Sequence, residues 1–214
     1  MISGPAAAGK IQSRAIGQVG SKVITTRDVQ ISSIMDHWFL LSNQKQRPVS
    51  PTNKNEHKDW LLEPKSSSFE KQFSTVLAEY LVMNEADNFS VAQLNSSEVQ
   101  KAAHNLSEDL KSWNEWEALD VSASELEAHV GRHMRAKEFL KFKTESMGMQ
   151  VSDEDAKKYY DLNRQRFNDL PFEGFRDSIK EFLTSRDVEA KMKDWFDVLR
   201  KKYKVKILPV ESTK

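Results

Sequence analysis

The sequence predicts a mainly α-helical protein that also contains one small antiparallel sheet. Only seven glycines and six prolines occur among the 214 residues, which is few for a β-sandwich or barrel with its many tight turns. Helix-starting residues recur along the chain, and apolar residues follow them at helical spacing. Strand-like segments occur near the two ends, so we expect the sheet there.

The first elements are predicted at Ala15–Ile24 (AIGQVGSKVI). Two short apolar segments flank Gly20-Ser21-Lys22, which predicts a hairpin or a bent strand. A helix is expected to follow, with Thr25 or Thr26 as its N-cap. Asp28 then lies in the first turn, where its negative charge meets the positive end of the helix dipole.

Four further helix starts share one chemistry, a serine followed three residues later by an acidic or amide side chain. This is the capping-box spacing or its aspartate variant. The pairs are Ser67 with Glu70, Ser97 with Gln100, Ser122 with Glu125, and Ser152 with Asp155. They predict helices over residues 69–88, 97–117, 123–147 and 153–167. A last helix of about 30 residues is predicted to begin at Pro171, whose fixed φ suits a first helical turn.

The closing segment, Tyr203–Leu208 (YKVKIL), alternates lysine with apolar residues and predicts a strand. A single strand leaves its backbone groups without partners. We therefore expect it to pair with Ile16–Ile24 and to join the two ends of the chain in one sheet. This predicts a single domain over residues 15–208 with a long loop at 44–68, a flexible leader at 1–14 and a flexible tail at 209–214.

Composition excludes several classes of site. The chain has no cysteine, so it has no disulfide, no thiolate zinc site and no cysteine nucleophile. Its 32 basic and 32 acidic side chains are interspersed, without the basic patch of a nucleic-acid-binding protein. No run of about 18 apolar residues predicts a transmembrane helix. We find no phosphate-binding loop and no nucleophile motif, so we expect no cofactor and no enzyme activity.

Four segments resemble the SurA/PpiD/PrsA-type periplasmic chaperone domains. VITTRDV (Val23–Val29) resembles the strand-to-helix opening of that family. LNSSEVQKA (Leu94–Ala102), VSASELEAHV (Val121–Val130) and VSDEDAKKYYDLNRQRF (Val151–Phe167) are similar to its recurring helix starts, the last most closely. The resemblance covers nearly the whole chain. It departs from the family at the 44–68 loop and at Trp113-Asn114-Glu115-Trp116.

The resemblance implies a SurA N-terminal-like helical domain in which a long helix and a terminal strand return to the first strand. In that family a parvulin-type prolyl isomerase domain follows the segment matched by Val151–Phe167. Here only Asn168, Asp169 and Leu170 separate Phe167 from Pro171. We therefore expect no isomerase domain and no isomerase activity.

The function implied is that of an ATP-independent holdase for unfolded or extended polypeptides, such as outer-membrane or secreted proteins. The implied compartment is the bacterial periplasm, with an export signal presumed to have been removed. A different class of function is also open: a non-catalytic adaptor or structural protein that binds one dedicated partner or itself. Exchange of a strand or helix between protomers would give a homodimer.

Candidate peptide-binding residues are apolar side chains expected on the surface. Met35, Trp38 and Phe39 lie on a helix with more apolar surface than one face needs, and Met147 and Met149 lie at a helix end. Flexible methionine side chains adapt to many apolar partners.

We expect no metal site, although one group of residues has the spacing of metal ligands. His129 and His133 are four residues apart on a predicted helix, and Glu125 precedes them by one turn, so the three share a face. An ordinary solvated helix face explains the same pattern.

Overall fold

The computed structural model describes residues 13–43, 59–89, 94–148, 151–168 and 170–208, and these are mainly helical, as the sequence predicts. The expected leader and tail lie almost wholly outside the described residues, as do Met149 and most of the 44–68 loop. Among the described residues, no helix is both long enough and apolar enough to cross a membrane.

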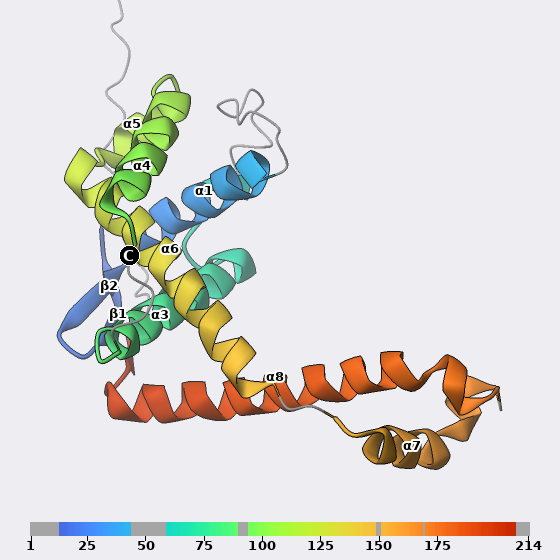
Figure 1. Ribbon diagram of the computed structural model, residues 1–214. Helices are drawn as coiled ribbons and strands as arrows, with labels where there is room; N and C mark the ends of the chain where they lie inside the picture. The colour runs from blue at the N-terminus through green and yellow to red at the C-terminus, as the bar shows by residue number, and fades with distance from the viewer. Residues whose placement is uncertain (1–12, 44–58, 90–93, 149–150, 169, 209–214) are drawn as a thin grey trace, which may run out of the picture. The chain divides into compact units, whose positions relative to one another are not determined.

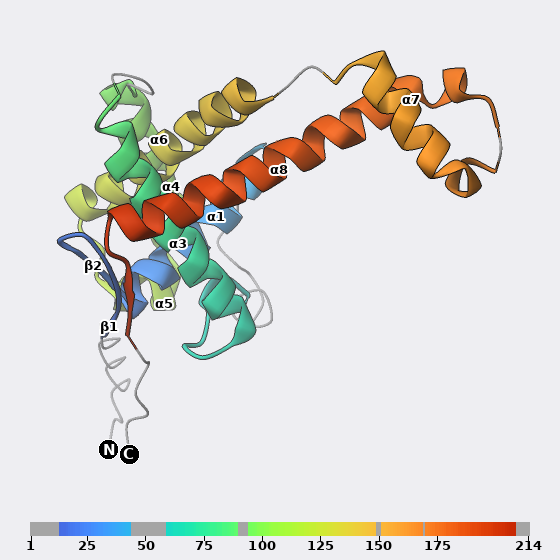
Figure 2. The same cartoon turned by 90° about the horizontal axis from the view of Figure 1, so that it is seen from below.

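The small sheet has the strand order β2-β1-β3. β1 (Ala15–Val19) and β2 (Lys22–Thr25) form a hairpin whose turn contains Gly20 at φ 58°, a conformation that glycine adopts without strain. β3 (Lys206–Ile207) lies antiparallel to β1, with Gly17 opposite Ile207 and Gln18 opposite Lys206. Figure 2 shows β3 beside β1. The predicted pairing of the two chain ends is therefore confirmed.

Three further contacts hold the closing segment in place. The Gly20 amide donates to the Tyr203 carbonyl at 2.8 Å, and the Leu208 amide donates to the Ile16 carbonyl at 2.9 Å. The Tyr203 hydroxyl lies 2.8 Å from Glu85 Oε2 on α3 (Ser67–Ala86). The closing segment is thus bound to the hairpin and also to a helix.

The helices begin close to where the capping pattern predicts them. α1 (Thr26–Asn43) is preceded by Thr25, whose amide donates to Asp28 Oδ2 at 2.8 Å while its hydroxyl oxygen accepts from the Asp28 amide at 3.2 Å. Such a reciprocal pair is a capping box in its aspartate form. α6 (Ala123–Met147) and α7 (Asp153–Leu162) begin after Ser122 and Ser152, which accept from the amides of the third residue on.

Two observed N-caps lie one or two residues before the serines that the sequence predicts. The N-cap of α3 is Ser66 instead of Ser67, and that of α4 (Ser96–Leu110) is Asn95 instead of Ser97. In both places several capping residues stand in a row. The residue with an extended backbone makes the cap, because its side chain can reach the amides ahead of it.

Three predicted helices are divided. The helix expected over 153–167 ends at Leu162, and a short 3-10 turn follows at Arg164–Phe167. The helix expected over 97–117 ends at Leu110 and resumes as α5 (Asn114–Leu119), because Trp113 has an extended backbone and both Trp113 and Trp116 are buried. The helix expected from Pro171 begins at Arg176, as α8 (Arg176–Lys202), after a short 3-10 turn at Phe172–Gly174. Glycine is unfavourable in a helix interior by about 1 kcal/mol, which favours the break.

The chain contains two compact units, and the single domain over residues 15–208 stays a prediction. One comprises Met1–Phe139 with Arg200–Lys214, and the other comprises Leu140–Leu199. α6 and α8 each continue from one unit into the other (Figure 1). A boundary inside a continuous helix leaves no change in apolar periodicity and no linker composition, so the sequence could not mark it.

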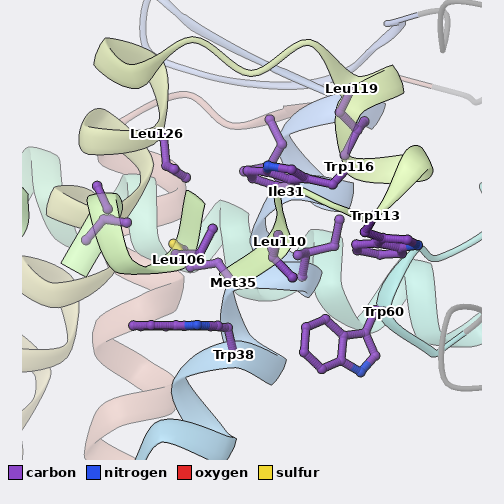
Figure 3. Packing of buried hydrophobic residues seen from close by; sticks show 13 residues of the cluster. Ile31, Met35, Trp38, Trp60, Leu106, Leu110, Trp113, Trp116, Leu119 and Leu126 are labelled. Carbon is purple, nitrogen blue, oxygen red and sulfur yellow. The ribbon is translucent and has the colours of Figure 1, made fainter. Parts of the chain in front are cut away.

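The larger unit has a core shared by α1, α4, α5 and α6, into which tryptophans from separate segments project (Figure 3). Trp60 and Trp113 meet edge to face, with ring centroids 6.1 Å apart. The core also contains Met35 and Trp38, whose side chains are 0% and 6% exposed. The described end of the predicted 44–68 loop thus contributes Trp60 to this core.

Candidate functional site

The expected peptide-binding residues are not gathered on the surface. Met35 and Trp38 lie in the core, which corrects the expectation that they are exposed. The Trp38 indole donates to Asp109 Oδ2 at 2.9 Å, so its polar group is satisfied there. Phe39 is half-buried and stacks on His133 with centroids 5.1 Å apart. Met147 is partly buried at the end of α6, and Met149 lies outside the described residues.

Exposed apolar side chains are instead prominent in the 140–199 unit. Its buried cluster contains Ala156, Tyr160 and Ile179, with partly buried aromatic rings around them. In the same unit Leu162 is 76% exposed, Leu170 53% and Phe182 43%. Exposed apolar side chains that form one patch mark binding surfaces, which makes these residues candidates for one.

We refer to Tyr159, Leu162, Leu170 and Phe182 as the α7–α8 surface. Tyr159 and Leu162 are three residues apart on α7 and therefore share a face. The Tyr159 ring lies 5.5 Å from that of Phe182 on α8 and 6.5 Å from that of Phe167. Nothing in the sequence pattern singled out these four residues together, because helical spacing does not show which apolar side chains remain exposed.

Hydrogen bonds connect α7 to α8 and to Leu170 around this surface. Lys180 Nζ on α8 donates to Asp153 Oδ1 at the start of α7 at 2.7 Å, and the Tyr160 hydroxyl donates to the Leu170 carbonyl. The Arg186 guanidinium lies 5.6 Å from the centroid of the Phe182 ring. Long cationic side chains can cover apolar surface with their methylene groups while their charge stays in water.

The structure pairs two of the three candidate metal ligands, Glu125 and His129, with other residues. Glu125 forms an ion pair with Arg27, whose guanidinium also donates to the Leu119 carbonyl at the end of α5 at 2.9 Å. The lone pair of His129 Nδ1 accepts from Arg132 at 2.8 Å. His129 Nε2 lies 3.5 Å from Asp28 Oδ1. Glu125 and His129 are therefore paired with Arg27, Arg132 and Asp28 instead of meeting at His133.

Arg132 and Glu79 form a buried ion pair between α6 and α3, with 3.0 Å from Nε to Oε2 and each side chain 7% exposed. Burial alone would raise the pKa of Glu79, but the hydrogen bond from His133 and the charge of Arg132 hold it below its usual value. Arg132 also donates to the Tyr80 hydroxyl at 2.9 Å. A guanidinium buried with this many partners is a fixed charge.

Cavities among the described residues include two in the larger unit. One of about 450 Å³ is bordered by the β1–β2 turn, Tyr80, Met83, Arg132 and Tyr203. The other, of about 670 Å³, is bordered by Ser33, His37, Leu61 and Gln72 among others. The larger cavity is lined mostly by polar and charged side chains, unlike the mainly apolar lining of small-ligand sites. The smaller one mixes apolar and aromatic side chains with charged groups such as Arg132. Neither contains a nucleophile paired with a base.

Comparisons of this chain with protein families, with curated proteins and with solved structures found no match. The class that the fold and the site define is that of a mainly helical protein with an exposed apolar surface.

Proposed function

We propose that this chain is an ATP-independent holdase-type chaperone, which binds unfolded or extended polypeptides and does not isomerise prolyl bonds. The observation that carries the proposal is the α7–α8 surface, where Leu162, Leu170 and Phe182 are exposed beside a small aromatic cluster. Unfolded chains expose apolar side chains of many shapes. A surface of aromatic and leucine side chains buries much area against them without requiring one sequence.

The order of the elements supports the same class. The resemblance to SurA-type domains implies a long helix and a final strand that return to the opening strand. α8 and β3 are arranged in this order, and β3 pairs with β1 of the same chain. Residues 168–170 again leave no room for an isomerase domain between η1 (Arg164–Phe167) and Pro171. The periplasmic location and the outer-membrane or secreted clients rest on the resemblance alone.

The sheet offers a second means of binding. β2 and β3 are its outer strands, and Val23 on β2 and Ile207 on β3 are 47% and 71% exposed. An extended client can add a strand at such an edge, because the backbone supplies hydrogen bonds whatever the client's sequence.

The test is the suppression of aggregation of several unrelated unfolded proteins, followed by light scattering. Leu162→Ser should weaken suppression by the full-length chain. The matched control is Leu40→Ser, because Leu40 is 57% exposed on α1 in the other unit. Equal suppression by the two variants would refute a role for the α7–α8 surface.

Two other outcomes would reassign the function. Tight, saturable binding to a single partner without any effect on aggregation would assign the adaptor role. Acceleration of prolyl isomerisation in a model peptide, well above background, would contradict the non-enzymatic part of the proposal.

A further inference from the structure

Three side chains that can bind metal meet in the larger unit, away from the α7–α8 surface. They are Asp36 on α1, Glu79 on α3 and His133 on α6, and one ligand atom of each lies within 4.8 Å of the other two. His133 Nδ1 is 2.8 Å from Glu79 Oε1 and 3.3 Å from Asp36 Oδ1. Three separate helices therefore bring one nitrogen and two carboxylate oxygens together.

The outer oxygen of each carboxylate is held by a neighbouring donor. Gln72 Nε2 donates to Asp36 Oδ2 at 2.7 Å, and Arg132 Nε donates to Glu79 Oε2 at 3.0 Å. These bonds fix the rotation of both carboxylates and leave Oδ1 and Oε1 directed inward. In metal sites, neighbouring groups hold the ligands in place in this way.

The inward oxygen of Asp36 lacks a donor. Asp36 Oδ1 is buried and accepts no hydrogen bond among the described residues. The N–H on His133 Nδ1 is already donated to Glu79, which accepts it. A buried carboxylate oxygen without a donor is costly, and a bound cation removes that cost.

We propose that Asp36, Glu79 and His133 bind one divalent transition-metal ion of the zinc class. In a tetrahedral zinc site with N and O ligands at about 2.1 Å, neighbouring ligand atoms are about 3.4 Å apart. The 3.3 Å between His133 Nδ1 and Asp36 Oδ1 is close to that value. The 2.8 Å between His133 Nδ1 and Glu79 Oε1 is a hydrogen-bond distance, which would lengthen once the ion replaces the shared proton. Two carboxylates and a neutral imidazole carry two negative charges, which balance the ion. His133 Nδ1 releases its proton when the ion binds.

The ion would join α1, α3 and α6 and stabilise the larger unit. It can enter from solvent, because the side chains of Asp36 and His133 are 28% and 19% exposed. The charge of Arg132 on Glu79 weakens that ligand. We therefore expect weaker binding than at a zinc site built from thiolates.

The test is a calorimetric titration of the metal-free full-length chain with Zn²⁺, complemented by Co²⁺ absorption, which reports coordination geometry. We expect one ion per chain, and loss of that site in Asp36→Asn and in His133→Gln. Gln72→Ala keeps all three ligands but frees Asp36 to rotate, so it should weaken binding about 10- to 100-fold. His104→Gln removes an exposed histidine on α4 and should leave binding unchanged.

Thermal unfolding separates loss of the site from loss of the fold. Zn²⁺ should raise the unfolding temperature of the wild type and of His104→Gln, and should leave that of His133→Gln unchanged. Absence of stoichiometric binding by the wild type would overturn the proposal. So would equal binding by the wild type, Asp36→Asn and His133→Gln. His133 would then serve only as a hydrogen-bonding bridge between two carboxylates.

Discussion

Replacement of His129 by glutamine should make the stability of this protein fall less steeply as the pH is lowered from neutral into mild acid. The His129 side chain is 3% exposed on α6, and its Nδ1 accepts a hydrogen bond from Arg132. Burial, together with the charge of Arg132, lowers the pKa of His129 from 6.5 to about 3. The folded protein therefore keeps this imidazole neutral at pH values where the unfolded chain protonates it.

The sign and size of the effect follow from this difference. Below the unfolded pKa, the unfolded state binds one proton more than the folded state. The free energy of unfolding therefore falls as pH decreases, by at most about 1.4 kcal/mol per pH unit. With the folded pKa at about 3, the loss attributable to His129 between neutral pH and pH 5 is roughly 2 kcal/mol.

Urea unfolding of the wild type and of His129→Gln at several pH values measures how much His129 contributes to the pH dependence of the free energy of unfolding. Glutamine can still accept a hydrogen bond from Arg132, so the variant should fold. Between neutral pH and pH 5 its free energy of unfolding should fall by roughly 2 kcal/mol less than that of the wild type. Other groups, including His133 with its raised pKa, titrate in both proteins and cancel in the difference. His104→Gln, which changes an exposed histidine, should keep the wild-type slope. Identical slopes for the wild type and His129→Gln would refute a neutral buried His129.

Three further predictions concern the packing of the sheet, the packing of the core and the N-cap of α7. Gly17→Ala should destabilise the sheet by about 1–3 kcal/mol in urea unfolding, since its Cβ would lie 2.8 Å from the Phe73 ring, whereas Gly174→Ala has open space and should have little effect. Leu106→Ala, at a fully buried position, should cost about 2–5 kcal/mol, and a loss below 1 kcal/mol would contradict the core assignment. Ser152→Ala should cost about 1 kcal/mol through loss of the α7 cap, and Ser152→Asp should restore most of it.

The sequence predicts the helix starts that are determined by side chains only a few residues apart. Thr25 and Ser152 make caps because the acidic side chain three residues on is part of the same short motif. The pairing of β3 with β1 was also predictable, although it joins the two ends of the chain. The backbone of one isolated strand must find a partner, and the chain offered one good candidate.

What the sequence could not predict depends on contacts between distant segments. Helical spacing placed Met35 and Trp38 on an apolar face, but only the packing of α4 and α5 against α1 decides that this face is buried. The spacing of His129 and His133 likewise identifies a shared helix side, not the neighbours across from it. Glu79 is 54 residues from His133, and no motif links them.

The proposed role of the α7–α8 surface is tested most directly by photo-crosslinking with an unfolded client. A photoreactive phenylalanine analogue is placed at Phe182 in one full-length variant and at Leu40 in another. Both positions are exposed, and they lie in different units. We expect several unrelated clients to crosslink from position 182 and scarcely from position 40. Equal crosslinking from the two positions, or none from position 182, would contradict polypeptide binding at this surface.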